Sequence, residues 1–166
     1  MVTSKNNAII FNNIDELIKR YELLENKQTV LVNGCFDIFS LGHLNLLKTA
    51  SEYGDFLVLA LNSDNSIKQL KGNTRPIRNF DERSEILASI RYVDYVVKFE
   101  QTTVMEILYK LKPTYWVKGG DYNPNKVHQG EKEIADSNNT RIIYADTLCE
   151  PTTRLIERLK NNETIR

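Results

Sequence analysis

The chain has 166 residues, and its 22 basic residues balance its 22 acidic residues. A domain of this length buries about 70% of its unfolded surface, and the lack of a basic excess argues against a general nucleic-acid binder. Cys35 and Cys149 lie far apart without metal-ligand spacing, so we expect two reduced thiols. No apolar run approaches about 18 residues and no apolar signal follows Met1, so the sequence predicts a cytoplasmic protein.

Apolar runs that suit buried strands recur along the chain, and amphipathic segments separate them. Asn13 and Glu16 form a capping box before a segment in which apolar residues repeat with helical spacing. Asn79 and Glu82 give the same start signal for a later helix. The strands are predicted at residues 29–32, 56–61, 93–99, 115–118 and 141–145.

Strands of nearly continuous Val, Leu and Ile that alternate with helices imply a parallel sheet covered on both faces. We therefore predict a single Rossmann-like, doubly wound α/β domain over residues 1–166, with a five-stranded, mainly parallel sheet and flexible ends at 1–12 and 161–166. Such sheets bind ligands beyond the carboxyl ends of their strands. Small and polar residues follow four of the predicted strands, at 33–34, 62–64, 119–121 and 146–147.

The most informative segment is the predicted turn from the first of these strands into a helix. Gly34 lies in the turn, and His43 lies in the first turn of the helix. A helix that begins at the end of a buried strand presents free N–H groups and the positive end of its dipole. This geometry suits a nucleotide phosphate. The chain has neither G-x-x-x-x-G-K-[ST] nor G-x-G-x-x-G after a strand, which argues against a P-loop and a dinucleotide site.

The same segment resembles the G-x-F-D-x-x-H-x-G-H signature of the cytidylyltransferase-like nucleotidyltransferases. The residues that carry the resemblance are Gly34, Phe36, Asp37, Gly42 and His43. Agreement continues in order along the chain, which is most similar to the branch of heptose 1-phosphate adenylyltransferases that make ADP-heptose. The later segments that agree are residues 61–64, 70–72, 75–77, 83–87, 93–94, 117–122 and 152–153.

The resemblance implies transfer of a nucleotidyl group, AMP first among the choices, to a sugar 1-phosphate such as D-glycero-D-manno-heptose 1-phosphate, with release of pyrophosphate. It also implies Mg²⁺ without an assigned protein ligand, and a homodimer that meets near residues 91–94. It implies no nucleic-acid or membrane partner. A cytidylyltransferase for glycerol phosphate or another polyol phosphate stays open, because it shares the phosphate machinery. A plain flavodoxin-like binding domain would not need the ordered motifs.

The resemblance assigns catalytic roles to four residues, which are Ser40, His43, Lys71 and Arg83. Ser40 stands where the family has its first signature histidine, and the loss of one such donor costs about 2.7–4 kcal/mol of activation free energy. A nucleotide-binding relative with impaired catalysis therefore also stays open. Asp37 has an alternative role, in which its carboxylate ties down the turn by accepting backbone N–H bonds. Arg83 has one as an ion-pair partner of Glu82 or Asp81.

The resemblance also implies three groups of nucleotide-binding residues. They are Gly34, Cys35, Phe36, Asp37 and Gly42 in the first turn, Lys118, Gly119, Gly120 and Asp121 after the Trp116 strand, and Thr152, Thr153 and Arg154 near the C-terminus. Glycines at 119 and 120 would let the backbone read the edge of a nucleobase, as similar enzymes do. Pro151 suits the first position of a helix, and Arg154 in the first turn is unfavourable there unless an anion is bound.

Overall fold

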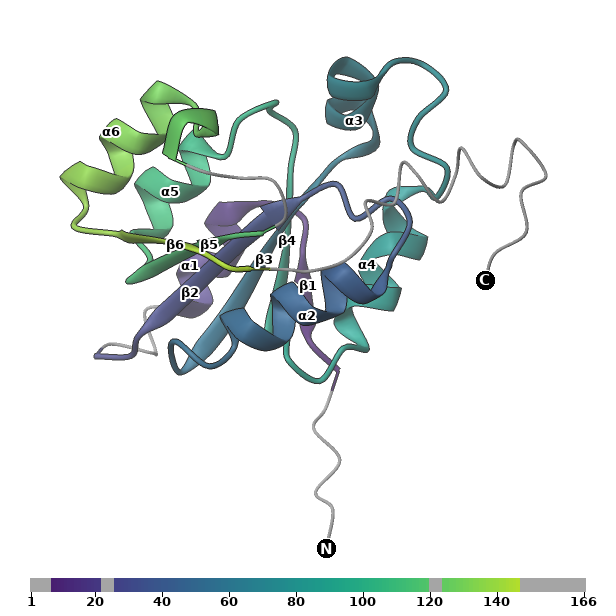
Figure 1. The fold of residues 1–166 in the computed structure, drawn as a ribbon. Coiled ribbons are helices and arrows are strands. Elements are labelled where there is room, and N and C mark those ends of the chain that lie inside the picture. The colour runs from purple at the N-terminus through teal and green to yellow at the C-terminus, as the bar shows by residue number, and fades with distance from the viewer. Residues whose placement is uncertain (1–6, 22–25, 120–123, 147–166) are drawn as a thin grey trace, which may run out of the picture.

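The computed structural model describes residues 7–21, 26–119 and 124–146. Six strands form one sheet in the order β1-β4-β3-β2-β5-β6, and every neighbouring pair is parallel (Figure 1). The predicted Rossmann-like α/β class is confirmed, and the predicted number of five strands is wrong by one. The strands are β1 Ile9–Phe11, β2 Thr29–Gly34, β3 Phe56–Asn62, β4 Tyr95–Phe99, β5 Tyr115–Lys118 and β6 Arg141–Tyr144.

The strand that the sequence did not predict is β1, at one edge of the sheet. It has three residues, pairs with β4, and falls in the stretch that we expected to be a flexible end. Ile9 and Ile10 are each 37% exposed, so this strand lacks the long buried run that marks the others. Its backbone pairing with β4, and not burial of both faces, holds it in place.

The helices follow the predicted start signals. Asn79 Oδ1 accepts the Glu82 N–H at 2.9 Å and Glu82 Oε2 accepts the Asn79 N–H at 3.2 Å, so the second predicted capping box is confirmed. At the first, Asn13 Oδ1 accepts the Glu16 N–H at 3.0 Å, but Glu16 Oε2 accepts the N–H of Asn12 and not that of Asn13. No helix in the described part of the chain combines the length and the apolar character needed to cross a membrane. The helices are α1 Ile14–Tyr21, α2 Leu41–Ala50, α3 Asp64–Lys71, α4 Phe80–Ala88, α5 Met105–Leu111 and α6 Gln129–Ser137, with a 3₁₀ turn at Pro124–Lys126.

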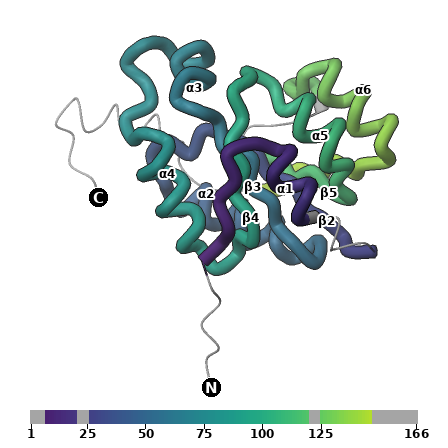
Figure 2. The backbone as a smooth tube through the Cα atoms, turned by 180° about the vertical axis from the view of Figure 1, so that it is seen from behind, coloured from purple at the N-terminus to yellow at the C-terminus, as the bar shows by residue number. Residues whose placement is uncertain are grey.

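Each face of the sheet carries its own hydrophobic core. Helices α2 and α4 pack on the face that includes Val30 and Val117. Helices α1, α5 and α6 pack on the face that includes Leu31 and Trp116 (Figure 2). Because side chains alternate along a strand, residues just beyond Leu31 and Trp116 on the same face point toward the α5 and α6 side.

The strand order reverses between β2 and β5, which we call the switch point. The chain runs outward from β2 to β3 and β4 and then crosses back to place β5 beside β2. In doubly wound sheets, ligands bind beyond the carboxyl ends of the strands at this place. Here β2 ends at Gly34 and β5 ends at Lys118, so the first group of predicted residues meets Lys118 and Gly119 of the second group at one edge of the sheet.

Candidate active site

The turn between β2 and α2 brings together seven predicted residues, which are Gly34, Cys35, Phe36, Asp37, Ser40, Gly42 and His43. Phe36 has a φ of 45°, a left-handed conformation that is uncommon outside glycine. A Cβ atom on Gly34 would lie 3.0 Å from Phe36 Cε2, so the glycine makes room for this ring. Backbone strain of this kind clusters at functional sites, where the surrounding structure holds it in place.

Ser40 is the N-cap residue of α2 and directly contacts His43. The Ser40 N–H donates to His43 Nδ1 at 3.2 Å, and Ser40 Oγ lies 3.1 Å from the same nitrogen. Because Nδ1 accepts the backbone bond, the proton of the neutral imidazole sits on Nε2. Serine is a preferred N-cap residue, so Ser40 both begins the helix and orients the histidine.

The His43 ring lies between two phenylalanine rings, with centroids 4.9 Å from Phe36 and 6.0 Å from Phe39. Burial lowers the pKa of His43, and the positive charge of Lys71 lowers it further, while a hydrogen bond with the backbone of Ile38 opposes the shift. The imidazole is therefore mainly neutral at pH 7. It can donate a hydrogen bond to a phosphate, but the positive charge must come from another residue.

Lys71, the last residue of α3, supplies such a charge and is exposed. Its positive charge acts on two groups of the β2–α2 turn, because it lowers the pKa values of both His43 and Cys35. Burial raises the pKa of the Cys35 thiol, and Lys71 opposes that rise. The structure therefore brings Lys71 to the same turn as His43, although the two residues are far apart in sequence.

Asp37 ties this turn to the segment that precedes α4. Its Oδ1 accepts the N–H groups of Ile77 at 2.7 Å and Arg78 at 3.2 Å. Its Oδ2 lies 2.6 Å from Arg75 Nε, in an ion pair that lacks the alignment of a hydrogen bond. The alternative in which Asp37 holds the turn therefore agrees with the structure, although the N–H groups come from a different loop.

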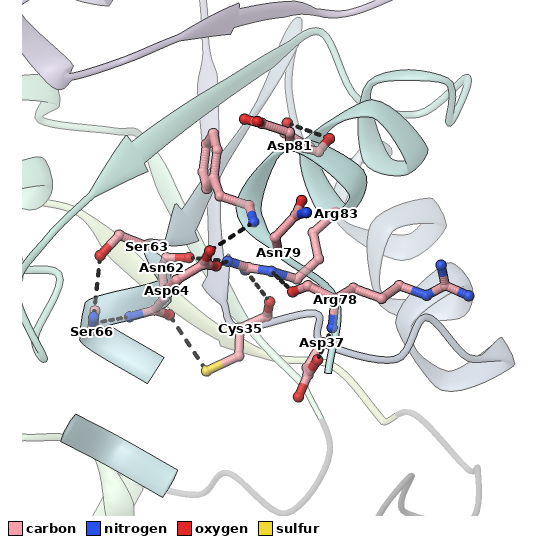
Figure 3. Close-up of polar contacts among 12 residues, drawn as sticks. Cys35, Asp37, Asn62, Ser63, Asp64, Ser66, Arg78, Asn79, Asp81 and Arg83 are labelled. Atoms are coloured by element: carbon pink, nitrogen blue, oxygen red, sulfur yellow. Dashed lines mark hydrogen bonds and ion pairs between the residues drawn. The ribbon is translucent and has the colours of Figure 1, made fainter. Parts of the chain in front are cut away.

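Arg83 lies beneath the turn and makes four hydrogen bonds within the protein (Figure 3). Its guanidinium donates to the carbonyl oxygens of Arg78 at 3.0 Å, Cys35 at 2.7 Å and Asn62 at 2.9 Å. It also pairs with Asp64 Oδ1 at 2.7 Å, and its side chain is fully buried. We call this group the arginine clamp, because it joins the carboxyl ends of β2 and β3 to α3 and α4.

The arginine clamp corrects the expected roles of Arg83. A side chain with no exposed surface and four bonds to the protein is not placed to receive a phosphate from solvent. Its acidic partner is Asp64 and not Glu82 or Asp81. Arg83 is therefore a positioning residue, which fixes the backbone on which the phosphate turn is built.

Lys118 lies at the other side of β2, at the switch point. Its Nζ is 3.4 Å from Asn33 Oδ1, 3.8 Å from Glu131 Oε2 and 4.1 Å from the centroid of the Trp116 ring. Asn33 Oδ1 also accepts the Trp116 Nε1–H at 2.9 Å. Burial lowers the pKa of Lys118 to about 8, and the Glu131 carboxylate opposes the shift. We call these four residues the lysine cluster.

Gly119 follows Lys118 and packs tightly against α2. A Cβ atom on Gly119 would lie 2.8 Å from Leu46 Cδ1. The absence of a side chain thus lets the end of β5 approach the helix that carries His43. This close packing gives Gly119 a structural role beside the predicted contact with a nucleobase.

A family model described as Cytidylyltransferase-like matches residues 31–161. The chain belongs to this family. The match begins inside β2 and includes the β2–α2 turn, the arginine clamp and the lysine cluster. The expected family is therefore confirmed.

Curated relatives of this cytidylyltransferase-like chain include proteins named Bifunctional protein HldE. The relative from Aliarcobacter butzleri is 44% identical over 153 residues, which cover 92% of this chain and 31% of the relative. Those from Syntrophotalea carbinolica and Vibrio cholerae are 42% and 37% identical and cover 83% and 87% of this chain, and 28% and 30% of the relatives. The chain thus spans about a third of the length of the curated relatives that it matches.

Solved structures agree with the cytidylyltransferase-like fold. A lipopolysaccharide core biosynthesis protein from Thermoplasma volcanium has a TM-score of 0.63 at 25% identity, over 75% of this chain and 100% of that chain. A pantoate-beta-alanine ligase from Francisella tularensis, solved with an ATP analogue and beta-alanine, has a TM-score of 0.63 at 18% identity, over 87% of this chain and 69% of that one. The second likeness concerns the fold alone.

Nucleotidyltransferases of this kind generally use a divalent metal ion. The described residues contain no group of three or more His, Cys, Asp or Glu side chains that could hold one. Both oxygens of Asp37 are already engaged by Arg75 and two backbone N–H groups. The described part of the site therefore does not form a protein cage for a metal.

Five predicted site residues lie outside the described residues, namely Gly120, Asp121, Thr152, Thr153 and Arg154. Four residues have contacts in the structure that their sequence positions did not predict, namely Asn33, Asn62, Asp64 and Glu131. Three of them follow predicted strands, namely Asn33, Asn62 and Asp64. Their positions indicated that they lie at the edge of the sheet, but not which residues they contact. Glu131 carried no signal, because an acidic residue in a helix usually faces solvent.

Proposed function

We propose that the chain is a nucleotidyltransferase domain that transfers AMP from ATP to D-glycero-D-manno-heptose 1-phosphate. The observation that supports the proposal is the β2–α2 turn at the carboxyl edge of a cytidylyltransferase-like fold, where His43 lies in the first turn of α2 and the charge of Lys71 lowers its pKa. The choice of acceptor rests on the resemblance to the heptose branch and on the relatives named HldE.

The proposed reaction is a direct, in-line displacement at the α-phosphorus of ATP. An oxygen of the sugar phosphate forms the new P–O bond, and the bond from the α-phosphorus to the bridging oxygen breaks. Pyrophosphate leaves with the electron pair, and the product is ADP-heptose. No covalent enzyme intermediate forms, so positioning and neutralisation of charge supply the catalysis.

The residues of the turn divide this work between hydrogen bonding and charge. His43 donates a hydrogen bond from Nε2 to a phosphate oxygen, because Ser40 occupies Nδ1. Lys71 supplies a positive charge to the same phosphates, since its ammonium group is exposed and close enough to shift the pKa of His43. The free N–H groups of α2 add the positive end of the helix dipole.

Mg²⁺ is the divalent ion that we propose for this reaction. Phosphate oxygens and water are its usual ligands at such sites, with one or two carboxylates at most. Bound there, it would offset negative charge on the triphosphate. The engagement of Asp37 by Arg75 supports a site in which the triphosphate itself brings the ion.

The proposed function is tested by release of pyrophosphate from mixtures of protein, Mg²⁺, one triphosphate and one acceptor. We expect release with ATP and heptose 1-phosphate, and less or none when CTP or GTP replaces ATP. Release with CTP and glycerol phosphate instead would favour the cytidylyltransferase alternative. Failure of every triphosphate with every sugar or polyol phosphate would reject catalysis.

The alternative of a nucleotide-binding relative with impaired catalysis has a specific observation behind it. Ser40 replaces a histidine of the signature, and its contacts are those of a helix cap. This alternative predicts that calorimetry finds ATP binding while no mixture releases pyrophosphate. It also predicts that Ser40→His does not restore turnover.

We also propose a homodimer that meets near residues 91–94. In this segment Val93 is buried and Asp94 Oδ2 accepts the Leu57 N–H at 2.9 Å, so these two residues serve the fold. Arg91 is the exposed residue of this segment. Sedimentation at micromolar concentration should give the mass of a dimer, and a monomer mass would refute this proposal.

A further inference from the structure

The lysine cluster is the group of buried charges that the proposed reaction does not use. The side chains of Lys118 and Glu131 are 5% and 8% exposed, and their charged atoms face each other at 3.8 Å. Burying a charge is costly unless a partner compensates it. A buried pair at the switch point, where α/β sheets bind ligands, therefore calls for a functional explanation.

Glu131 is held in place from two helices. It lies in the first turn of α6, and its Oε1 accepts the Val104 N–H, at the start of α5, at 2.9 Å. This bond needs only one carboxylate oxygen and no negative charge. The second oxygen, Oε2, is the one directed at Lys118. The cap explains why Glu131 is fixed, but it does not explain why the second oxygen faces a buried ammonium group.

Asn33 connects the buried pair to the edge of the sheet. Its Oδ1 accepts from Lys118 and Trp116, and its Nδ2 group makes no hydrogen bond to another described residue. Asn33 is partly exposed and lies one residue before Gly34, where the phosphate turn begins. The Lys118 charge therefore lies next to the backbone that meets the phosphates of the substrate.

We propose that Glu131 is a positioning residue for nucleotidyl transfer, which acts through Lys118 by holding a positive charge at the switch point, where it attracts the phosphate groups of the substrates. This inference rests on the proposed function and adds a second positive charge to the site, on the opposite side of β2 from Lys71. In an interior of low dielectric, such a charge acts on a nearby anion more strongly than it would in water.

The charge of Lys118 depends on pH in a direction that the contacts determine. Burial lowers the pKa of Lys118 to about 8, and Glu131, from α6, is the charged group that opposes this. The neighbour from β2 is Asn33, which does not titrate, and the register partner from β6 is Tyr144, whose pKa burial raises above its usual value. The charge is thus present below about pH 8 and lost above it, and removal of the Glu131 carboxylate lowers that pH.

The test measures ATP affinity by calorimetry between pH 7 and pH 9.5, without acceptor and without turnover. A phosphate monoester has a second pKa of about 6, so it is about nine-tenths ionised at pH 7 and its charge changes very little as pH rises through 8. We expect the wild-type affinity to fall by about tenfold as pH rises through 8. Glu131→Gln keeps an acceptor for the Val104 N–H, and its ATP affinity should begin to fall at a lower pH than that of the wild type. Lys118→Met should bind weakly throughout and lack the fall.

The matched control is Glu133→Gln, since Glu133 is exposed on the same helix. It should follow the wild-type curve. If the ATP affinity of Glu131→Gln is lower than that of the wild type by the same factor at every pH, Glu131 acts only as a helix cap. That result would overturn the proposal. An unchanged affinity in Lys118→Met would also overturn it, because the charge would not reach the substrate.

A second measurement does not depend on nucleotide. NMR titration of the Lys118 side chain should show a lower pKa in Glu131→Gln than in the wild type, and an equal pKa would overturn the role of Glu131. Should Glu131→Gln fail to fold, Lys118→Arg decides, because its guanidinium stays charged and must remove the pH dependence of ATP affinity. A wild type that binds no ATP at any pH rejects the proposed function, whereas pH-independent binding rejects this inference alone.

Discussion

Arg83 and Lys118 are two buried cations at the same edge of the same sheet, on opposite sides of the phosphate turn. Arg83 makes four hydrogen bonds of 2.7–3.0 Å to carbonyl and carboxylate oxygens. Lys118 Nζ lies 3.4 Å from Asn33 Oδ1 and 3.8 Å from Glu131 Oε2. The difference reflects their chemistry, because a planar guanidinium can meet several fixed acceptors at once, whereas an ammonium group is a single compact charge.

This contrast separates a structural cation from a responsive one. Guanidinium stays protonated in proteins, so the arginine clamp holds the ends of β2 and β3 in the same way at every accessible pH. An amine that burial has shifted can gain or lose its proton, and it can respond to a charge brought by a ligand. Burial of a cation therefore does not reveal its role, but whether the group can lose its proton does.

The largest effect should come from opening the arginine clamp. Arg83→Met removes four hydrogen bonds and leaves the carbonyls of Cys35 and Asn62 without their donor. Breaking one partner of a buried pair costs about 3–5 kcal/mol, so we expect a loss of that size in the free energy of unfolding. Urea denaturation followed by circular dichroism measures it.

Two further variants sharpen this result. Arg83→Lys keeps the positive charge but lacks the planar guanidinium that meets several acceptors. We expect it to recover less than half of the unfolding free energy that Arg83→Met loses. Arg78→Met is the matched control, since its side chain is 51% exposed and its backbone makes the contacts that matter. Equal stability of Arg83→Met and wild type would remove the distinction between the two cations.

The next effect concerns the pH dependence of stability at Lys118. Its folded pKa of about 8 lies below the value of about 10.4 for an unfolded chain. Between these values the unfolded state binds more protons than the folded state, so this group makes stability rise with pH. The stability of the wild type relative to Lys118→Met should increase by an amount on the order of 3 kcal/mol between pH 8 and 10.5.

Thermal or urea unfolding at several pH values measures this difference. Lys48→Met is a suitable control, because Lys48 is exposed on α2, and its curve should remain parallel to that of the wild type. If the stability curve of Lys118→Met is also parallel to that of the wild type, Lys118 has the same pKa in the folded and unfolded chain. Lys118 would then not be the responsive cation of the two.

Loss of His43 tests the turn that the arginine clamp supports. His43→Ala removes the Nε2 donor, and the loss of one such donor lowers kcat by about 100-fold. The measurement is pyrophosphate release beside ATP affinity, and affinity should change much less than kcat. Leu41→Ala, an exposed change in the same helix turn, should leave both nearly unchanged. Equal losses in both variants would point to damage of the helix.

The smallest effects are expected at Ser40. Ser40→His removes a preferred N-cap residue, which costs about 1 kcal/mol of stability, and it restores the signature histidine. We therefore expect a faster release of pyrophosphate from a slightly less stable protein. An unchanged or lower rate would mean that the site has adapted to serine, whose N–H and hydroxyl both contact His43.

Periodicity and capping residues predicted most of the fold, because five strands and the helix starts depend on local sequence and on burial of both sheet faces. β1 was missed because three residues with two exposed side chains carry no such pattern. Its position depends on pairing with β4, which is a long-range contact. Long-range pairing of a short edge strand leaves little trace in the sequence.

The site was predictable where the chain itself brings residues together, as from Gly34 to His43. It was less predictable where the fold does so. Arg83 was assigned to phosphate binding, yet carbonyls of residues 35, 62 and 78 surround its guanidinium, and backbone acceptors have no sequence signature. Glu131 was missed for the same reason, because its partner Lys118 lies on another element.

The packing of Phe36 has a consequence for how variants of Gly34 should be interpreted. One added methyl group at residue 34 would press on the Phe36 ring, which in turn lies against the imidazole of His43. Gly34→Ala would therefore lower activity by shifting the Phe36 ring, which in turn would move the donor nitrogen of His43. Such a loss would be no proof that the backbone of residue 34 touches a phosphate.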